Sequence, residues 1–116
     1  MLALILTLAC STQTTPTAQA GSPCMYEASS KTYKTCNHAS MGKCHSYGST
    51  CEPECMFEAS SGLHKQCAHA SMGQCHHYTS TCEPDCMYDP SDGVYKECAH
   101  KSMGKCHHYT GTCEPA

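Results

Sequence analysis

The sequence predicts a small disulfide-rich fold made of three tandem 31-residue units of short β-hairpins and turns. Two observations support this prediction. Thirteen of the 116 residues are Cys, and from residue 24 onward their spacing repeats three times without insertion or deletion. With no Trp and a single Phe, the chain has little material for a large hydrophobic core. Cross-links between Cys must therefore supply much of the stability.

Residues 1–23 are predicted to be an export signal followed by a polar tether. Residues 2–9 are apolar except for Thr7, but they are too few to span a bilayer, which needs about 20 residues. Two processing sites compete. Ala18-Gln19-Ala20 has the small-x-small pattern of signal peptidase, whereas residues 6–10 resemble a bacterial lipobox and make Cys10 a lipidation candidate. Both alternatives place the mature chain outside the cytoplasm, either secreted or lipid-anchored at the cell envelope, where disulfides persist.

The three units span residues 24–54, 55–85 and 86–116, and are called the first, second and third unit. Within each unit the four Cys are separated by eleven, seven and six residues. Without Cys10 the 13 Cys become an even set of twelve, which predicts six disulfides. The predicted disulfide Cys are Cys24, Cys36, Cys44, Cys51, Cys55, Cys67, Cys75, Cys82, Cys86, Cys98, Cys106 and Cys113.

Each unit is expected to begin with a β-hairpin. In the third unit, Pro90 suits the first turn position and Gly93 can adopt the left-handed conformation that closes a four-residue loop. This register places Tyr88 opposite Tyr95, and it places the first and second Cys of the unit on opposite faces, which disfavours a bridge between them. The other pairings stay open. Lys31 occupies the position of Gly93, so the loop of the first unit is predicted to be strained.

The middle of each unit is predicted to contain a second turn at Ser-Met-Gly, followed by a short strand. A helical alternative exists, because residues 32, 33, 36, 37, 40 and 41 also follow a 3.6-residue period. Short disulfide-linked helical hairpins are thus the competing fold. In either case we expect a linear array of units, with contacts mostly between neighbours.

Histidines recur at two positions of every unit and are candidate metal ligands. Together with two Met per unit they form a soft-ligand set that suits copper, while the His alone can serve zinc. The competing interpretation is that the Met fill a small core and the His pack within the unit, in which case no cofactor is expected. The candidate metal ligands are His38, His45, His69, His76, His100 and His107.

Composition also limits the function. A net charge of −3, with seven Lys and no Arg, argues against nucleic acid as a partner. No catalytic constellation stands out from residues that simply recur, so the protein is not expected to be an enzyme. We expect a non-catalytic module that presents three copies of one binding or structural face to an extracellular or surface ligand, with membrane contact only through an N-terminal lipid anchor.

Two alternatives remain. One is transition-metal binding through His and Met outside the cytoplasm. The other is a tandem protease inhibitor or toxin that presents a Lys near a Cys in a disulfide-braced loop. Candidates are Lys34, Lys65 and Lys96, two residues before a Cys, and Lys43 and Lys105, directly before one.

The even set of Cys predicts that all twelve repeat Cys are oxidised in protein taken from its native compartment. Intact mass measured before and after reduction, followed by thiol alkylation, tests this. Free thiols among these Cys would contradict the disulfide framework.

Overall fold

The computed structural model describes residues 22–115, which form nine β-strands in three antiparallel sheets of three strands each. No helix occurs within residues 22–115, so the predicted β-hairpin units are confirmed and the helical alternative is not supported. The strands are β1 (Cys24–Glu27), β2 (Thr32–Ser40) and β3 (Lys43–Thr50), then β4 (Cys55–Glu58), β5 (Leu63–Ser71) and β6 (Gln74–Thr81), then β7 (Cys86–Asp89), β8 (Val94–Ser102) and β9 (Lys105–Thr112).

The first hairpin of each unit has the predicted register. Tyr88 pairs with Tyr95 between β7 and β8, and the loop closes through Gly93 at φ +74°. Lys31 adopts the same left-handed conformation at φ +59°, although it carries a side chain. The loop of the first unit is therefore the strained one, as predicted.

The second hairpin closes through a two-residue turn with positive φ at both positions. In the first unit Ser40 pairs with Lys43 around Met41 at φ 54° and Gly42 at φ 77°. These angles are those of a type I′ turn, which fits the right-handed twist of the flanking strands. Met in the left-handed region costs roughly 1–2 kcal/mol, yet the same residue recurs in all three units.

Two disulfides staple each unit. In the first unit Cys24 bonds to Cys51 and Cys36 to Cys44, and the other two units repeat this pattern. The outer bridge ties the start of the first strand to the segment after the third strand, and the inner bridge ties β2 to β3. Over sequence separations of 27 and 8 residues, the loop-closure model gives about 3.6 and 2.5 kcal/mol per bridge.

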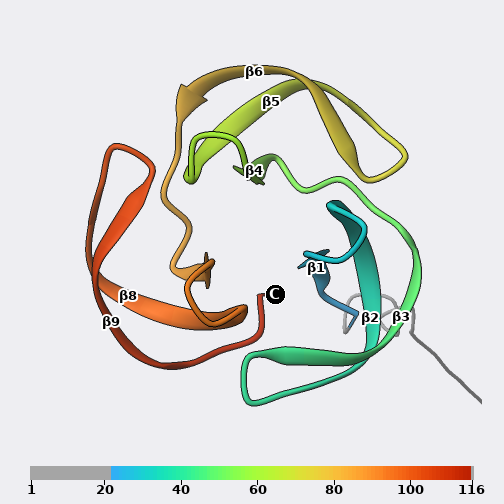
Figure 1. The fold of residues 1–116 in the computed structure, drawn as a ribbon, viewed down its shortest axis with the longest axis horizontal. Helices are drawn as coiled ribbons and strands as arrows, with labels where there is room; N and C mark the ends of the chain where they lie inside the picture. Colours follow the sequence, from blue (N-terminus) through green and yellow to red (C-terminus); the bar gives the residue numbers. More distant parts are fainter. Residues whose placement is uncertain (1–21, 116) are drawn as a thin grey trace, which may run out of the picture.

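The three sheets close into a ring with approximate threefold symmetry (Figure 1). The backbone N–H of Tyr33 donates to the carbonyl of Gly73 in the second unit at 2.8 Å. The N–H of His64 donates likewise to Gly104 in the third unit, and that of Tyr95 to Gly42, back in the first unit. The predicted linear array is therefore wrong, because its two ends join.

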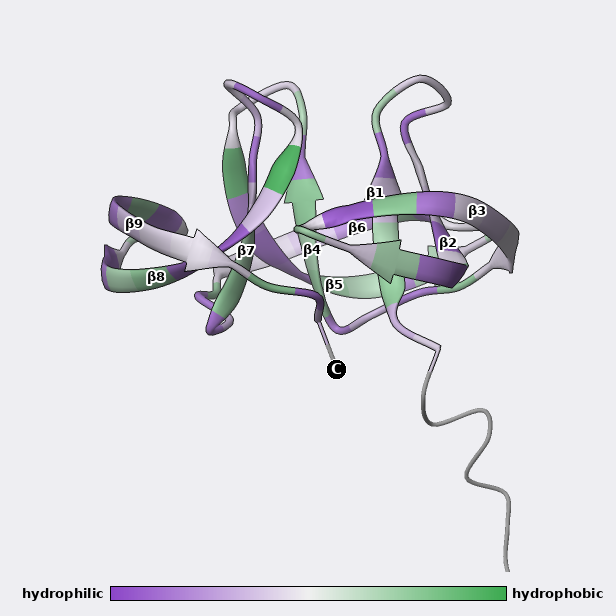
Figure 2. Ribbon diagram, turned by 90° about the horizontal axis from the view of Figure 1, so that it is seen from below, coloured by the Kyte–Doolittle hydropathy of each residue, from purple (hydrophilic) through white to green (hydrophobic). Residues whose placement is uncertain are grey.

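The core lies on the axis of this ring, where the three short strands meet. The rings of Tyr26, Phe57 and Tyr88 pack against one another with centroids 5.1–5.4 Å apart, in tilted or edge-to-face geometry. Met25 and its two equivalents are at most 1% exposed. Figure 2 shows β1, β4 and β7 upright in the middle, with the longer hairpins lying across them outside. Every unit contributes to one shared core, and this explains why the array closes.

Glycine at the tip of the second hairpin is required by the contact between units. A Cβ at Gly73 would lie 2.6 Å from the carbonyl oxygen of Tyr33, whereas a Cβ at Gly62, with a similar φ of +74°, would meet nothing within 4 Å. We expect Gly62→Ala to cost only the left-handed strain, roughly 1–2 kcal/mol. Gly73→Ala should cost about 2 kcal/mol more, because two hydrogen bonds between units are also disturbed.

Guanidinium unfolding of the oxidised variants, followed by near-ultraviolet circular dichroism of tyrosine, measures this difference. Equal destabilisation by the two substitutions would contradict the close contact between units.

Candidate functional site

Each interface between units contains a crevice. The three crevices, called the inter-unit crevices, have volumes of about 320 Å³ between the first and second units, 290 Å³ between the second and third, and 270 Å³ between the third and first. Equivalent positions line all three crevices. One unit contributes the loop of its first hairpin and a buried aromatic residue. The next unit contributes a tyrosine, an acidic residue and its second turn. The ring therefore repeats one site three times.

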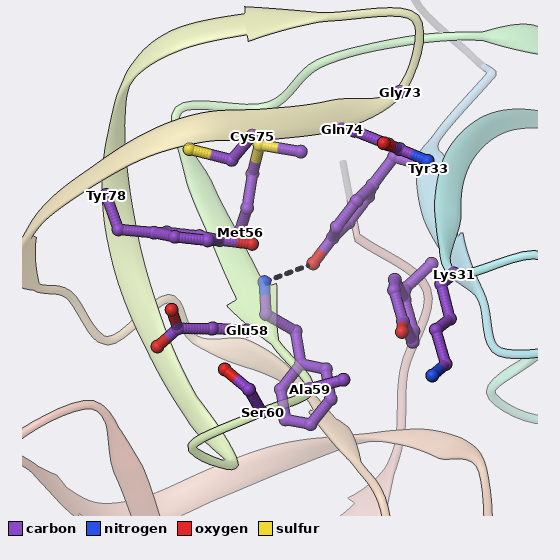
Figure 3. A pocket seen from close by; sticks show the side chains of 12 residues that line it. Lys31, Tyr33, Met56, Glu58, Ala59, Ser60, Gly73, Gln74, Cys75 and Tyr78 are labelled. Carbon is purple, nitrogen blue, oxygen red and sulfur yellow. Dashed lines mark hydrogen bonds between the residues drawn. The ribbon is translucent and has the colours of Figure 1, made fainter.

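The crevice between the first and second units shows how these groups are placed (Figure 3). The hydroxyl of Tyr33 accepts a hydrogen bond from the backbone N–H of Phe57 at 2.7 Å, and this bond holds the Tyr33 side chain in place in the crevice. Tyr78 and Glu58 line one side, and Lys31 lies on the opposite side. An aromatic ring, a carboxylate and an ammonium group thus surround a space that is open to solvent.

The carboxylate in each crevice is already paired within its own hairpin. Glu58 forms an ion pair with Lys65 at 2.7 Å, and Glu27 forms the equivalent pair with Lys34 at 2.7 Å. The hydrogen bond from Lys65, supported by one from Ser61, holds the pKa of Glu58 below its usual range. The acidic group of the crevice is therefore ionised but neutralised within its own hairpin, whereas Lys31 of the first crevice forms no ion pair among residues 22–115.

The tyrosines that line the crevices keep their protons. Burial raises the pKa of Tyr78, and the nearby charge of Glu58 raises it further. Tyr47 and Tyr109 occupy the same place in the other crevices, and burial raises their pKa as well. Their hydroxyls donate toward the backbone carbonyls of Tyr26 and Tyr88 at 3.4 and 3.5 Å. These groups are suited to hydrogen bonding and to packing against a ligand.

A glutamate that is not among the predicted site residues forms a hydrogen bond across each interface between units. The carboxylate of Glu52 accepts a hydrogen bond from the N–H of Gly73 at 2.8 Å, and Glu83 and Glu114 bind Gly104 and Gly42 in the same way. From the sequence, Glu-Pro is expected only to keep the segment between units extended, and the carboxylate itself has no predicted role. The signal was present nonetheless, because Thr-Cys-Glu-Pro ends all three units.

The second interface breaks the symmetry at His64. At the other two interfaces a tyrosine hydroxyl accepts a hydrogen bond from a backbone N–H of the next unit. Tyr33 accepts from Phe57, and Tyr95 accepts from Tyr26, both at 2.7 Å. His64 stands in the equivalent position and is only 4% exposed. Its Nδ1 lies 3.4 Å from the carbonyl of Gly104 instead. Burial lowers the pKa of this imidazole below its usual value.

The six predicted metal ligands come together in pairs. The ring centroids lie 5.4 Å apart for His38 and His45, and 5.6 Å apart in each of the other two units. All six residues are exposed. Among residues 22–115, no three His, Cys, Asp or Glu are grouped as ligands of one ion.

The core Met lie apart from these His. Met25 and its equivalents are enclosed in the core, whereas the paired imidazoles face solvent. Met41, Met72 and Met103 occupy the hairpin tips and are 77–78% exposed. The predicted convergence of both imidazoles with the core Met is therefore not seen, while the tip Met remain near in sequence.

Three of the Lys proposed for the inhibitor alternative are held in ion pairs. Lys34 and Lys65 lie on β2 and β5 and bind the carboxylates of their own hairpins, and Lys96 binds Asp89 at 3.1 Å. An inhibitor residue must project from an extended loop into the protease. These three Lys lack that arrangement, whereas Lys43 and Lys105 are exposed beside the second turn and are in none of these ion pairs.

A fourth cavity of about 450 Å³ receives residues from all three units. Cys24, Cys55 and Cys86 line it together with Pro53, Pro84 and Pro115, so it lies about the axis of the ring. Unlike the inter-unit crevices, it occurs once.

All twelve predicted disulfide Cys are paired, which points to an oxidising, extracytoplasmic environment. No helix within the described part of the chain is long and apolar enough to cross a membrane. Cys10 and both predicted processing sites fall outside the described residues.

Comparisons of the chain with protein-family models, with curated proteins and with solved structures found no match.

His64 makes the ring sensitive to acid. Its pKa in the folded protein is lowered by burial, so the unfolded chain binds more protons below about pH 6.5, and the free energy of unfolding falls as pH drops through this range. We expect His64→Tyr to raise the free energy of unfolding by about 1 kcal/mol through a hydrogen bond from the N–H of Tyr88.

The same variant should lose the acid sensitivity that His64 contributes. Denaturant unfolding at pH 5 and pH 7.5 measures both effects. A pH dependence that is unchanged in His64→Tyr would contradict the assignment of this sensitivity to the buried imidazole.

Proposed function

We propose that this protein is an exported, non-catalytic binding module that holds a repeated surface ligand in its three inter-unit crevices. One observation carries the proposal: the same crevice, lined by equivalent residues, occurs at every interface, with volumes of about 270–320 Å³. Three weak sites on one rigid frame bind a repetitive ligand much more tightly than one site does. The N-terminal segment would deliver the module outside the cell or anchor it to the envelope through Cys10.

The lining favours a neutral ligand that is rich in hydroxyl groups. The carboxylate is already balanced by a Lys of its own hairpin, so a cationic ligand gains little from it. Protonated tyrosine hydroxyls and exposed hydroxyls such as that of Ser60 offer hydrogen bonds, while the ring of Tyr78 offers an apolar face. A saccharide unit combines hydroxyl groups with apolar C–H faces, and repeats of it occur on cell surfaces and in matrices.

The non-catalytic part of the proposal rests on the state of the titratable groups. A general base or acid works best when its pKa lies near the working pH. The acid in the crevice is instead held ionised by Lys65, and the phenol of Tyr78 is held protonated. Both are thus suited to holding a ligand and poorly suited to moving a proton.

A glycan array probed with labelled, oxidised protein tests this proposal. We expect retention on densely immobilised neutral oligosaccharides and weak binding of the same saccharides in free, monovalent form. Ala59 lines the first crevice on an exposed loop, so Ala59→Trp should fill it and reduce retention several-fold, and Ala28→Trp should do the same in the crevice between the third and first units.

Ala68→Trp provides the matched control, because Ala68 is exposed on β5 and lines none of the crevices. Retention should be unchanged in this variant. If no saccharide retains the protein, or if Ala59→Trp and Ala68→Trp behave alike, the inter-unit crevices are not saccharide sites.

A further inference from the structure

The outer hairpins carry three copies of an exposed histidine pair. His38 on β2 and His45 on β3 have ring centroids 5.4 Å apart and an interplanar angle of 53°. The pairs His69 and His76, and His100 and His107, repeat this arrangement at 5.6 Å, with angles of 59° and 56°. The hairpins that carry these pairs form the rim of the ring, away from the shared core (Figure 1).

The spacing matches that of two imidazoles bound to one metal ion. With Zn–N bonds of about 2.0–2.1 Å and a tetrahedral angle, two coordinating rings have centroids about 5 Å apart. The rings are tilted and not stacked. The separation of the rings is therefore compatible with chelation of one ion by both imidazoles.

The hairpin holds each pair in place. The inner disulfide, Cys36–Cys44 in the first unit, clamps the two strands beside the pair, and the register shift between His38 and Ala39 brings the two rings together. Ser40 Oγ lies 2.9 Å from His45 Nε2, and the other units repeat this contact at 2.9 and 3.0 Å. When Nε2 carries the proton, it donates a hydrogen bond to the serine hydroxyl, and the lone pair of Nδ1 is then available to a metal ion. Hydrogen bonds of this kind orient metal-binding histidines.

Comparison of the units with one another indicates that stability alone does not explain the pairs. Both histidines are exposed in every unit, so they bury little surface. The neighbouring exposed positions vary: Asn37 is replaced by Ala in the other units, and Ser46 is replaced by His. The paired histidines and the orienting serine do not vary among the three units.

We propose that each unit holds one divalent transition-metal ion on its histidine pair, at His38 and His45, His69 and His76, and His100 and His107. Every repeat Cys is in a disulfide, so no thiolate competes for the ion. Two imidazoles suit Cu(II), Ni(II) and Zn(II), and Cu(II) binds tightest in this series. With two protein ligands, the remaining coordination positions stay open to water or to a group of a partner molecule. These sites lie outside the inter-unit crevices and do not depend on the ligand of the crevices.

Titration of the full oxidised chain with Cu(II), followed by calorimetry and electron paramagnetic resonance, tests the proposal. We expect one equivalent bound per pair, with hyperfine coupling to imidazole nitrogen. His38→Ala with His45→Ala should remove one equivalent. His45→Ala alone should weaken the site in the first unit by about a hundredfold or more, because the second linked ligand is lost.

His77 and His108 lie directly opposite His69 and His100 in their sheets, so the first unit, which has Ser46 at this position, gives the clearest test. The matched control is Asn37→Ala with Ser46→Ala, which changes two exposed residues of β2 and β3 beside the first pair and removes no imidazole. This variant should bind as many equivalents as the natural chain, and the tyrosine circular dichroism of every variant should match it. The proposal is overturned if removing the pair at His38 and His45 leaves the stoichiometry unchanged, or if the control loses equivalents. If a variant fails to fold, Gln in place of Ala at the same position keeps a polar side chain and gives the same readout.

Discussion

The contact between neighbouring units is the interaction on which the rest of the structure depends. At each interface a backbone N–H donates to a glycine carbonyl, and the N–H of that glycine donates to a glutamate carboxylate. The third such contact joins Tyr95 to Gly42 and closes the ring. Closure brings Tyr26, Phe57 and Tyr88 into mutual contact. The aromatic cluster on the axis takes one ring from each unit, so no single unit contains it.

The disulfides and the shared core act at different levels. The bridges act within units, since each joins two Cys of the same unit. They restrict the unfolded chain and fix the shape of each hairpin. The contacts between units are not covalent, and they alone determine how the hairpins are arranged. The position of the inter-unit crevices follows from this division, because each crevice lies where two covalently braced hairpins meet.

Threefold repetition also shows where the molecule tolerates variation. Tyr33 and Tyr95 use their hydroxyls to bind the next unit, but His64 fills the same position without an equivalent contact to the N–H of Tyr88. The ring still closes, because the backbone hydrogen bonds and the glutamate are the same at all three interfaces. At this interface the hydrogen bond from a backbone N–H to a tyrosine hydroxyl is missing, and a buried imidazole with a lowered pKa takes its place.

The sequence by itself determined the local structure. Alternating residues and turn-forming residues specify the hairpins, so the pairing of Tyr88 with Tyr95 and the strained Lys31 could be read from the chain. The even number of repeat Cys predicted six bridges, but which Cys bond to each other depends on the twist and register of all three strands in a unit.

Only the tertiary structure decided that the units form a ring, because closure depends on the angle between successive units and on contacts between residues about 70 positions apart, such as Tyr26 and Tyr95. For the same reason the sequence identified the histidines as candidates one by one, while the structure brought them into pairs and created the inter-unit crevices, which exist in no single unit.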